Sequence, residues 1–431
     1  PPQARADLGA AAPRTARVGW VTVHVVGAGL AGLAAAAALA EAGLEVELSE
    51  AAATAGGRCR SYFDAQLGLT IDNGNHLVLS GNHATRDYLR LLGAEDRLAG
   101  PSEAAFAFRD MRGGERWTVR ANPGPIGWWV LSKARRVPGT RATDYLALLA
   151  LIGPQGGRRL DEAIRCEGPL WERLIEPLML AALNTEPSSG SAALAAAVVR
   201  ETLAMGGRAF MPRIATPSLE AAFVAPALAY LAARGAEVRL GVRVDSFGTE
   251  GERVVAMATS EGRLSVDPAE SVVLAVPPWI APLVLPGTPA PTAFRAIVNG
   301  HFKIRPPQGS PRMLGLVGGQ AQWLFAFEDR VSVTVSGADV MAERPREEIA
   351  AALWADVAAA LNLDGELPPW RIVKERRATF AATPDQQALR PKAKTRWRNL
   401  ALAGDWTDTG LPATIEGAIR SGRTAANLLH S

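Results

Sequence analysis

Three glycines at fixed spacing separate an apolar segment from an alanine-rich one near the start of the chain. These are Gly27, Gly29 and Gly32, in the pattern Gly-x-Gly-x-x-Gly. The first glycine permits a tight turn, the second lets a pyrophosphate approach the backbone, and the third lets a helix pack closely on a strand. Leu30 and Ala31 open the expected helix, whose first amides attract anions. The sequence therefore predicts a dinucleotide site formed by these five residues.

A carboxylate follows at the distance that is typical of ribose recognition. Glu50 ends a second expected strand, 23 positions after Gly27. Gly56, Gly57 and Arg58 come next, where backbone amides and a guanidinium can meet a phosphate or the edge of a flavin. We expect these four residues to contact the cofactor.

A second strand, glycine and acid lie near the other end of the chain. Gly404 and Asp405 follow an apolar segment, and Ala413, Thr414 and Ile415 enter a final expected helix. With the Gly-Gly-Arg segment, this arrangement resembles the flavin amine oxidase and carotenoid desaturase superfamily. The resemblance implies that the acid lies near the ribityl chain and that the helix start faces the flavin pyrimidine, whose reduced form a helix dipole stabilises. FAD is therefore favoured over NAD.

The expected fold class is α/β, with a Rossmann-like FAD-binding domain interleaved with a mixed α+β substrate domain. A block of strands begins at residues 238–244, and the superfamily resemblance implies a backbone contact from Val244 to adenine. A helix is expected at 347–361, and the block 81–215 is predicted to be mainly helical. The predicted parts are an N-terminal arm at 1–20, an FAD-binding domain at 21–80, 216–284 and 396–431, and a substrate domain at 81–215 and 285–395.

Composition excludes several classes of protein. The chain has 431 residues, 48% of them hydrophobic, which is enough for two sizeable cores. A net charge of +3 without a basic, aromatic surface run argues against nucleic acid as a partner. Two cysteines, Cys59 and Cys166, indicate a reducing compartment, and five histidines without ligand spacing predict no metal site. No stretch has the length of a membrane span or of a signal-peptide core, so we expect a cytoplasmic protein.

More specific segments identify a branch of the superfamily. Asp72-Asn73-Gly74-Asn75-His76 is similar to the Asp-Asn-Gly-x-His segment of the squalene-associated FAD-dependent desaturases, the hydroxysqualene dehydroxylases of hopanoid biosynthesis. Asn75 departs from the glutamine that is more frequent there. Further similar segments, which together span nearly the whole chain after residue 21, are 176–185, 212–213 and 403–414. The resemblance implies reductive conversion of hydroxysqualene to squalene with reduced FAD, and makes upstream enzymes of squalene synthesis candidate partners.

This reaction needs an acid, because hydroxide is a poor leaving group. The candidate proton donors are His76, Asp72, His301 and Lys303. Each has a competing structural interpretation. Asp72 lies in a turn sequence, and His76 begins an apolar run. His301 and Lys303 alternate on an expected strand and would share one face, although a register slip of one residue would reverse that face.

A thirty-carbon isoprenoid substrate needs a long apolar tunnel and access from a membrane. The candidate lining residues are Trp128, Trp129, Leu131, Leu146, Leu148, Leu149, Leu151, Leu178, Met179 and Leu180. The segment 125–136 pairs two tryptophans with basic residues, as in an interfacial segment. Burial of this segment in a core is the competing interpretation. We expect peripheral attachment through 125–136 to the inner face of the cytoplasmic membrane.

Three other functions remain open at this point. A phytoene-type carotenoid desaturase would run hydride transfer in the opposite direction on the same fold. A polyamine or amino-acid oxidase would need an aromatic cage for its ammonium group, and four tyrosines give that little support. A lipid-binding module without catalysis, as in Rab escort proteins, belongs to a different class.

Overall fold

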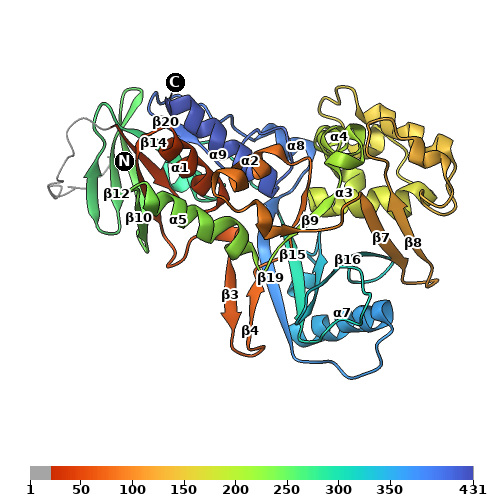
Figure 1. Cartoon of the computed structure of the whole chain (residues 1–431). Helices are drawn as coiled ribbons and strands as arrows, with labels where there is room; N and C mark the ends of the chain where they lie inside the picture. Colours follow the sequence, from red (N-terminus) through yellow and green to blue (C-terminus); the bar gives the residue numbers. More distant parts are fainter. Residues whose placement is uncertain (1–20, 431) are drawn as a thin grey trace.

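The computed structural model describes residues 21–430, and the predicted arm at 1–20 lies outside this range. Figure 1 shows a nucleotide-type sheet with its helices at one end of the molecule. A second, larger sheet and a group of short helices lie at the other end. Long strands and connections join the two ends, so the chain passes between them several times.

A five-stranded parallel sheet forms the first part. In spatial order its strands are β10 (Glu237–Leu240), β2 (Glu45–Glu50), β1 (Thr22–Val26), β14 (Ser271–Leu274) and β20 (Leu400–Leu402). The helices around it are α1 (Leu30–Glu41), α2 (His83–Leu91), α5 (Ala225–Ala233) and α9 (Ile415–His430). The central strand is buried along its whole length. The predicted Rossmann-like architecture is confirmed.

The alanine-rich composition of α1 follows from its position. This helix packs against β1, β2 and β14 on one side and against α9 on another, so almost every residue is buried. A Cβ atom on Gly422 of α9 would lie 2.2 Å from the backbone oxygen of Ala31. Only small side chains allow such a close approach of two helices.

The strand block predicted from residue 238 is divided between two sheets. The chain turns after β10 at Gly241, whose φ is +77°. It then enters an antiparallel sheet formed by β11 (Val244–Glu250), β12 (Arg253–Thr259) and β13 (Gly262–Ser265). The short helix α6 (Ala281–Val284) packs on β11.

A seven-stranded mixed sheet forms the second part. In spatial order its strands are β19 (Trp370–Phe380), β15 (Phe294–Phe302), β18 (Val331–Val335), β17 (Trp323–Ala326), β16 (Met313–Val317), β7 (Ala105–Asp110) and β8 (Arg116–Arg120). The predicted helix at 347–361 is α7 (Arg346–Leu361), which covers β15 and β19. The block 81–215 contributes β7 and β8 as well as helices, because Phe106 and Phe108 alternate with smaller residues and bury one strand face.

Short elements complete the described chain. The helical region contains η3 (Trp128–Leu131), η4 (Ala142–Leu151), η5 (Leu160–Glu162), η6 (Trp171–Ile175), α3 (Glu176–Leu183), η7 (Pro187–Ser189), α4 (Ala192–Glu201), η8 (Leu203–Met205) and η9 (Gly207–Ala209). Small strands are β3 (Ser61–Asp64), β4 (Leu69–Asp72), β5 (Leu77–Leu79), β6 (Leu98–Ala99) and β9 (Pro212–Ala215). The remaining helices are η1 (Gly57–Cys59), η2 (Glu95–Arg97), η10 (Glu220–Val224), η11 (Met341–Glu343) and α8 (Pro384–Ala388).

Candidate active site

The three glycines of the first turn meet different constraints. Gly27 has φ +105°, and a Cβ atom there would lie 2.5 Å from the Ala275 oxygen. A Cβ atom on Gly32 would lie 1.8 Å from the Gly27 oxygen. At Gly29, in contrast, no atom of residues 21–430 other than its chain neighbours lies within 4 Å of the Cβ position. Two glycines therefore serve internal packing, while the third leaves open space at the N-terminus of α1, where a phosphate fits.

The carboxylate of Glu50 is held at the end of β2, beside this turn. Its Oε2 accepts a hydrogen bond from the backbone nitrogen of Ala28 at 2.7 Å, and its Oε1 accepts one from that of Ala52 at 2.8 Å. The backbone oxygen of Glu50 accepts a bond from Val242, two residues before Val244. Glu50 and Val244, the residues predicted to contact ribose and adenine, therefore lie on two segments that a backbone hydrogen bond joins.

The Gly-Gly-Arg segment joins distant parts of the chain. Gly56 donates to the Ala28 oxygen at 2.8 Å, and a Cβ atom on Gly57 would lie 3.3 Å from the Gly29 Cα. Arg58 Nη2 donates to Asp405 Oδ1 at 2.7 Å. The arginine side chain is 37% exposed, whereas its aspartate partner is buried. A charged pair therefore lies next to the open space at α1.

The start of α9 lies on the same side of the sheet as the start of α1. Because β1, β14 and β20 are parallel, the helices that follow β1 and β20 both begin at the carboxyl edge of the sheet. Thr414 caps α9, since its Oγ1 accepts a bond from Gly417 at 3.0 Å. Two helix N-termini therefore lie at one edge of the sheet, which suits a pyrophosphate and an electron-rich ring.

A buried arginine that the sequence interpretation missed fixes the turn after Gly404. Arg390 donates to the backbone oxygens of Asp405, at 3.1 Å, and of Thr407. Its guanidinium also lies 4.8 Å from the ring centroid of Phe380. Burial lowers the pKa of Arg390 to about 10, so it stays charged at neutral pH. No motif marks this residue, because its role depends on contacts with a turn that lies 15 residues later.

Asp72 is buried, and one of its carboxylate oxygens accepts two hydrogen bonds. Its Oδ1 accepts from Ser61 Oγ at 2.6 Å and from the backbone nitrogen of Leu219 at 2.9 Å. Its Oδ2 lies 4.0 Å from Arg330. Burial raises the pKa of Asp72. The carboxylate connects β3, β4 and the segment that leads into α5, as expected for a residue that fixes a turn.

His301 and Lys303 do not share a face. His301 is fully buried on β15, with Nδ1 2.8 Å from Ser332 Oγ. Burial and the positive charge of Arg330 lower the pKa of His301 to about 3, so the imidazole is neutral. Lys303 lies beyond the end of β15 and is exposed. Its Nζ is 3.7 Å from the Cβ position of Gly68, in the turn between β3 and β4.

His76 differs from the other three candidates. It is partly exposed, and within the described residues its ring makes no hydrogen bond. The surrounding protein removes water from most of the imidazole, and this desolvation together with the nearby charge of Arg58 lowers the pKa of His76 to about 4. The structure therefore places this imidazole, neutral at physiological pH, within electrostatic reach of the Arg58–Asp405 pair.

The asparagines before His76 fix this segment to the seven-stranded sheet. Asn75 Nδ2 donates to Thr334 Oγ1 at 3.1 Å, and that hydroxyl donates to Asn299 Oδ1 at 2.7 Å. Asn73 Nδ2 donates to Glu375 Oε2 at 3.2 Å. The sequence interpretation missed Asn299 and Thr334, although polar residues at buried positions of apolar strands were a detectable signal.

Seven large apolar side chains of the helical region are exposed, and we call this set the apolar patch. Its members are Ile126, Trp128, Leu131, Leu146, Leu149, Ile152 and Met205. Trp129 is buried and packs on Tyr145, with ring centroids 5.3 Å apart, which joins η3 to η4. Arg135 lies over the ring of Trp128 at 5.0 Å.

The exposure of these side chains shows that part of the predicted tunnel lining was wrong. Leu131, Leu146 and Leu149 point to solvent, with 71%, 60% and 58% exposure, because short 3-10 helices present them outward. Leu151 and Met179 are buried as expected. In residues 21–430, the structure contains no helix that is long and apolar enough to cross a bilayer.

Comparison with known proteins agrees with this geometry. Residues 30–430 match the family model of flavin-containing amine oxidoreductases. The chain is 52% identical to the hydroxysqualene dehydroxylase of Rhodopseudomonas palustris, covering 95% of this chain and 98% of that protein. It is 50% identical to the protein of the same name from Sinorhizobium fredii and 45% identical to that from Zymomonas mobilis, each covering 94% of this chain and at least 97% of the relative.

Other similarities are local or concern the fold alone. An L-amino acid oxidase from Lachesis muta matches over 73 residues, which is 14% of its length. Among solved structures, a putrescine oxidase variant has a TM-score of 0.70 at 19% identity, covering 95% of this chain and all of that one. An oxidoreductase from Methanosarcina mazei has a TM-score of 0.71 at 14% identity, covering 94% and 100%.

Proposed function

The chain belongs to the flavin-containing amine oxidoreductases and, within them, to the hydroxysqualene dehydroxylases, and from this premise we propose that it converts hydroxysqualene to squalene. It is an FAD-dependent oxidoreductase of the squalene and hopanoid pathway. In the proposed reaction a C–O bond breaks and a C–H bond forms. The hydroxyl leaves as water after taking up a proton. The full-length similarity to three dehydroxylases is the observation that carries this conclusion.

The residues around the first turn suit FAD. We propose that the pyrophosphate lies in the open space at Gly29, and that Glu50 binds the adenosine ribose, with Val244 beside the adenine. The same arrangement leaves Arg58 and Asp405 for the ribityl and flavin end. Gly27, Leu30, Ala31, Gly32, Gly56, Gly57, Gly404, Ala413, Thr414 and Ile415 would complete the contacts. Reduced FAD supplies the hydride.

The start of α9 would stabilise negative charge on the flavin pyrimidine. Partial positive charge at a helix N-terminus is equivalent to about half an elementary charge. The segment Ala413–Ile415 lies at the start of α9, the helix that packs on α1. The chain thus offers positive potential at the proposed positions of the pyrophosphate and of the flavin ring.

We propose His76 as the group that contacts the departing hydroxyl. It is partly exposed, its ring makes no hydrogen bond within residues 21–430, and it lies near Arg58. With its pKa lowered to about 4, the imidazole is neutral at rest and orients the hydroxyl by a hydrogen bond. It has to take up a proton from solvent before it can pass one to the departing hydroxyl, which then leaves as water. Asp72 fixes the turn that carries His76. Buried His301 and distant Lys303 have lower priority.

The first experiment is anaerobic. FAD-loaded protein is reduced, hydroxysqualene is added, and flavin reoxidation is followed by absorbance while squalene is measured by mass spectrometry. One squalene per flavin reoxidised is the expected result. Reoxidation without squalene, or reduction of oxidised enzyme by phytoene, would contradict the dehydroxylase.

We also propose that the apolar patch contacts the inner face of the cytoplasmic membrane. The substrate is a membrane-soluble isoprenoid, and the patch combines exposed apolar side chains with Lys133 and Arg135. The segment 125–136 supplies only part of it, because η4 adds Leu146 and Leu149. Several large apolar side chains exposed in one region typically mark an interaction site.

Vesicle flotation tests this attachment. Trp128→Ser with Leu131→Ser should reduce binding to anionic phospholipid vesicles at least fivefold. Leu283→Ser with Val340→Ser is the matched control, since both side chains are exposed but lie outside the patch. Trp129 is unsuitable as a target because it is buried. Equal binding of both double variants would discard the proposal.

A further inference from the structure

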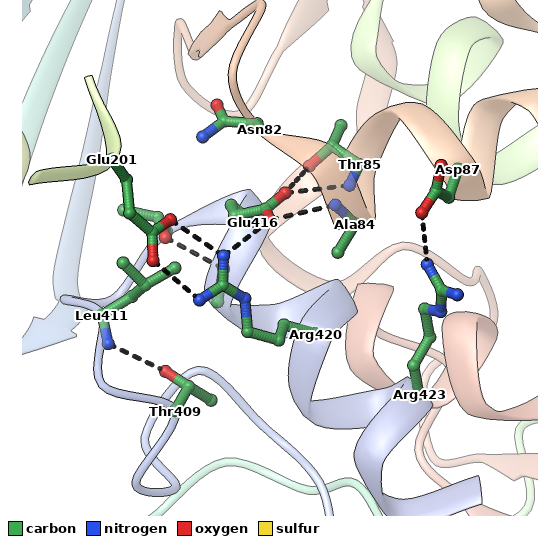
Figure 2. A network of polar contacts seen from close by, with 12 residues as sticks. Asn82, Ala84, Thr85, Asp87, Glu201, Thr409, Leu411, Glu416, Arg420 and Arg423 are labelled. Carbon is green, nitrogen blue, oxygen red and sulfur yellow. Dashed lines mark hydrogen bonds and ion pairs between the residues drawn. The ribbon is translucent and has the colours of Figure 1, made fainter. Parts of the chain in front are cut away.

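The carboxylate of Glu416, the second residue of α9, is buried and caps a different helix. Figure 2 shows it pointing to the start of α2. Its Oε1 accepts from the backbone nitrogen of Ala84 at 3.0 Å, and its Oε2 accepts from the nitrogen and the hydroxyl of Thr85, both at 2.8 Å. Only 3% of Glu416 is exposed. The first-turn amides of α2 thus obtain their acceptor from α9.

Asn82, the residue before α2, does not cap this helix, so Glu416 supplies the acceptor for the first-turn amides. Asn82 precedes the helix and is a preferred capping residue. Its side-chain oxygen instead accepts a bond from Leu79 at 2.7 Å, and it makes no capping bond. The start of α2 therefore depends on a residue more than 330 positions later in the chain.

Arg420 connects this carboxylate to the helical region. It lies one turn after Glu416 on α9, and its Nη2 donates to Glu416 Oε1 at 3.0 Å. The same guanidinium binds Glu201, the last residue of α4, through two bonds of 2.9 Å (Figure 2). Paired bonds of this kind fix both distance and orientation. One chain of charges therefore joins α2, α9 and α4.

We propose that Glu416, Arg420 and Glu201 form a positioning clamp for the first turn of α9, and thereby set the affinity of the chain for FAD. The inference rests on the proposed placement of the flavin at Ala413–Ile415. Glu416 directly follows that segment, so a shift at the carboxylate moves the amides that would face the flavin. The clamp also couples flavin binding to α4, which belongs to the proposed substrate domain.

Three variants separate positioning from simple stabilisation. Glu416→Gln leaves only one side-chain oxygen for two α2 amides and turns an NH₂ group toward Arg420. Glu201→Gln removes the charge at the half-exposed end while the cap stays in place. Asp87→Asn is the matched control, because it breaks another contact between α2 and α9, the Asp87–Arg423 pair at 3.0 Å, far from the first turn (Figure 2).

The readouts are the FAD dissociation constant of the apoprotein and the rise in melting temperature that FAD produces. We expect Glu416→Gln to weaken FAD binding about tenfold and Glu201→Gln about threefold, with a smaller FAD-induced rise in both. Asp87→Asn should stay within twofold of wild type. Lower apoprotein stability with unchanged FAD affinity would overturn the proposal.

Two further outcomes are also decisive. If Glu416→Gln does not fold, Glu201→Gln decides, since its side chain is partly exposed and α2 keeps its cap. If wild-type protein binds FAD but does not convert hydroxysqualene, the proposed function fails while the clamp is still judged from FAD affinity.

Discussion

Gly29 and Gly32 should respond in opposite ways to the same added methyl group. Gly29 has φ −70° and an empty Cβ position, so alanine fits without strain. Lower chain entropy in the unfolded state stabilises such a substitution by about 0.4–1 kcal/mol. Alanine is a poorer N-cap residue than glycine by roughly a similar amount. These effects nearly cancel, so the free energy of unfolding of the Gly29→Ala apoprotein should stay within about 0.5 kcal/mol of wild type.

FAD affinity should change much more than stability in this variant. A methyl group at Gly29 occupies the space proposed for the pyrophosphate and weakens its hydrogen bonds to the α1 amides. Hydrogen bonds to charged groups contribute about 1.5–3 kcal/mol each. Loss of one such bond corresponds to FAD binding that is roughly 10- to 100-fold weaker.

Gly32→Ala is the contrasting variant. Its Cβ atom would meet the Gly27 oxygen at 1.8 Å, so the helix must move away from the turn. We expect the apoprotein itself to lose about 2–4 kcal/mol of stability. Denaturant unfolding of the apoproteins and calorimetric titration with FAD measure both quantities. Wild-type FAD affinity in Gly29→Ala, or equal loss of apoprotein stability in the two variants, would refute the reasoning.

Three further predictions concern buried groups. Because His301 has a folded pKa of about 3 against about 6.5 unfolded, its contribution to stability is complete above pH 6.5 and lost as the pH falls toward 3. Between pH 7 and pH 5 wild type should lose roughly 2 kcal/mol more than His301→Gln in urea unfolding, and parallel losses would contradict this. Burial raises the pKa of the Cys59 thiol to about 12, so mass spectrometry should find native alkylation at Cys166 before Cys59; equal rates would show an open site. Asn184 has φ +48° and accepts a bond from Gly337. Asn184→Ala should therefore lose roughly 1 kcal/mol more stability than Asn184→Gly in chemical denaturation, and the reverse order would dismiss backbone strain as the cause.

The nucleotide turn was predictable because its determinants are local. The glycines, the strand before them and the helix after them lie within 20 residues, so periodicity and spacing describe the whole unit. Glu50 could be found in the same way. The strands of the five-stranded sheet and the helices α1 and α9 followed from these signals together with the C-terminal strand. Helix α2 lies in the block that was assigned to the substrate domain, and α5 was not predicted.

The fate of the four proton-donor candidates was not predictable, because it depends on tertiary packing. His76 and His301 are the same residue type in apolar surroundings, yet one is partly exposed near Arg58 and the other is fully buried against Ser332. Lys303 was placed on a strand that ends one residue earlier. Sequence alternation cannot locate a strand end that a neighbouring segment determines.

The exposed leucines of the apolar patch were also not predictable from the sequence. Apolar residues are usually buried, so the leucines of 146–151 were assigned to a tunnel lining. In the structure, Leu146 and Leu149 lie on the outer side of η4, while Leu151 is buried. A short 3-10 helix has no long amphipathic period, so its outward face cannot be recognised from spacing.

The order of the strands in the five-stranded sheet has a consequence for biosynthesis. Its strands come from residues 22–50, 237–240, 271–274 and 400–402, and α9 packs on α1 from the other end of the chain. A ribosome adds about 5–20 residues per second, so the first turn emerges roughly 20 seconds to more than a minute before its last partners. During that interval the alanine-rich face of α1 is not yet packed against α9. FAD loading should therefore be a post-translational event, and nascent chains that are stalled before residue 400 should not retain flavin.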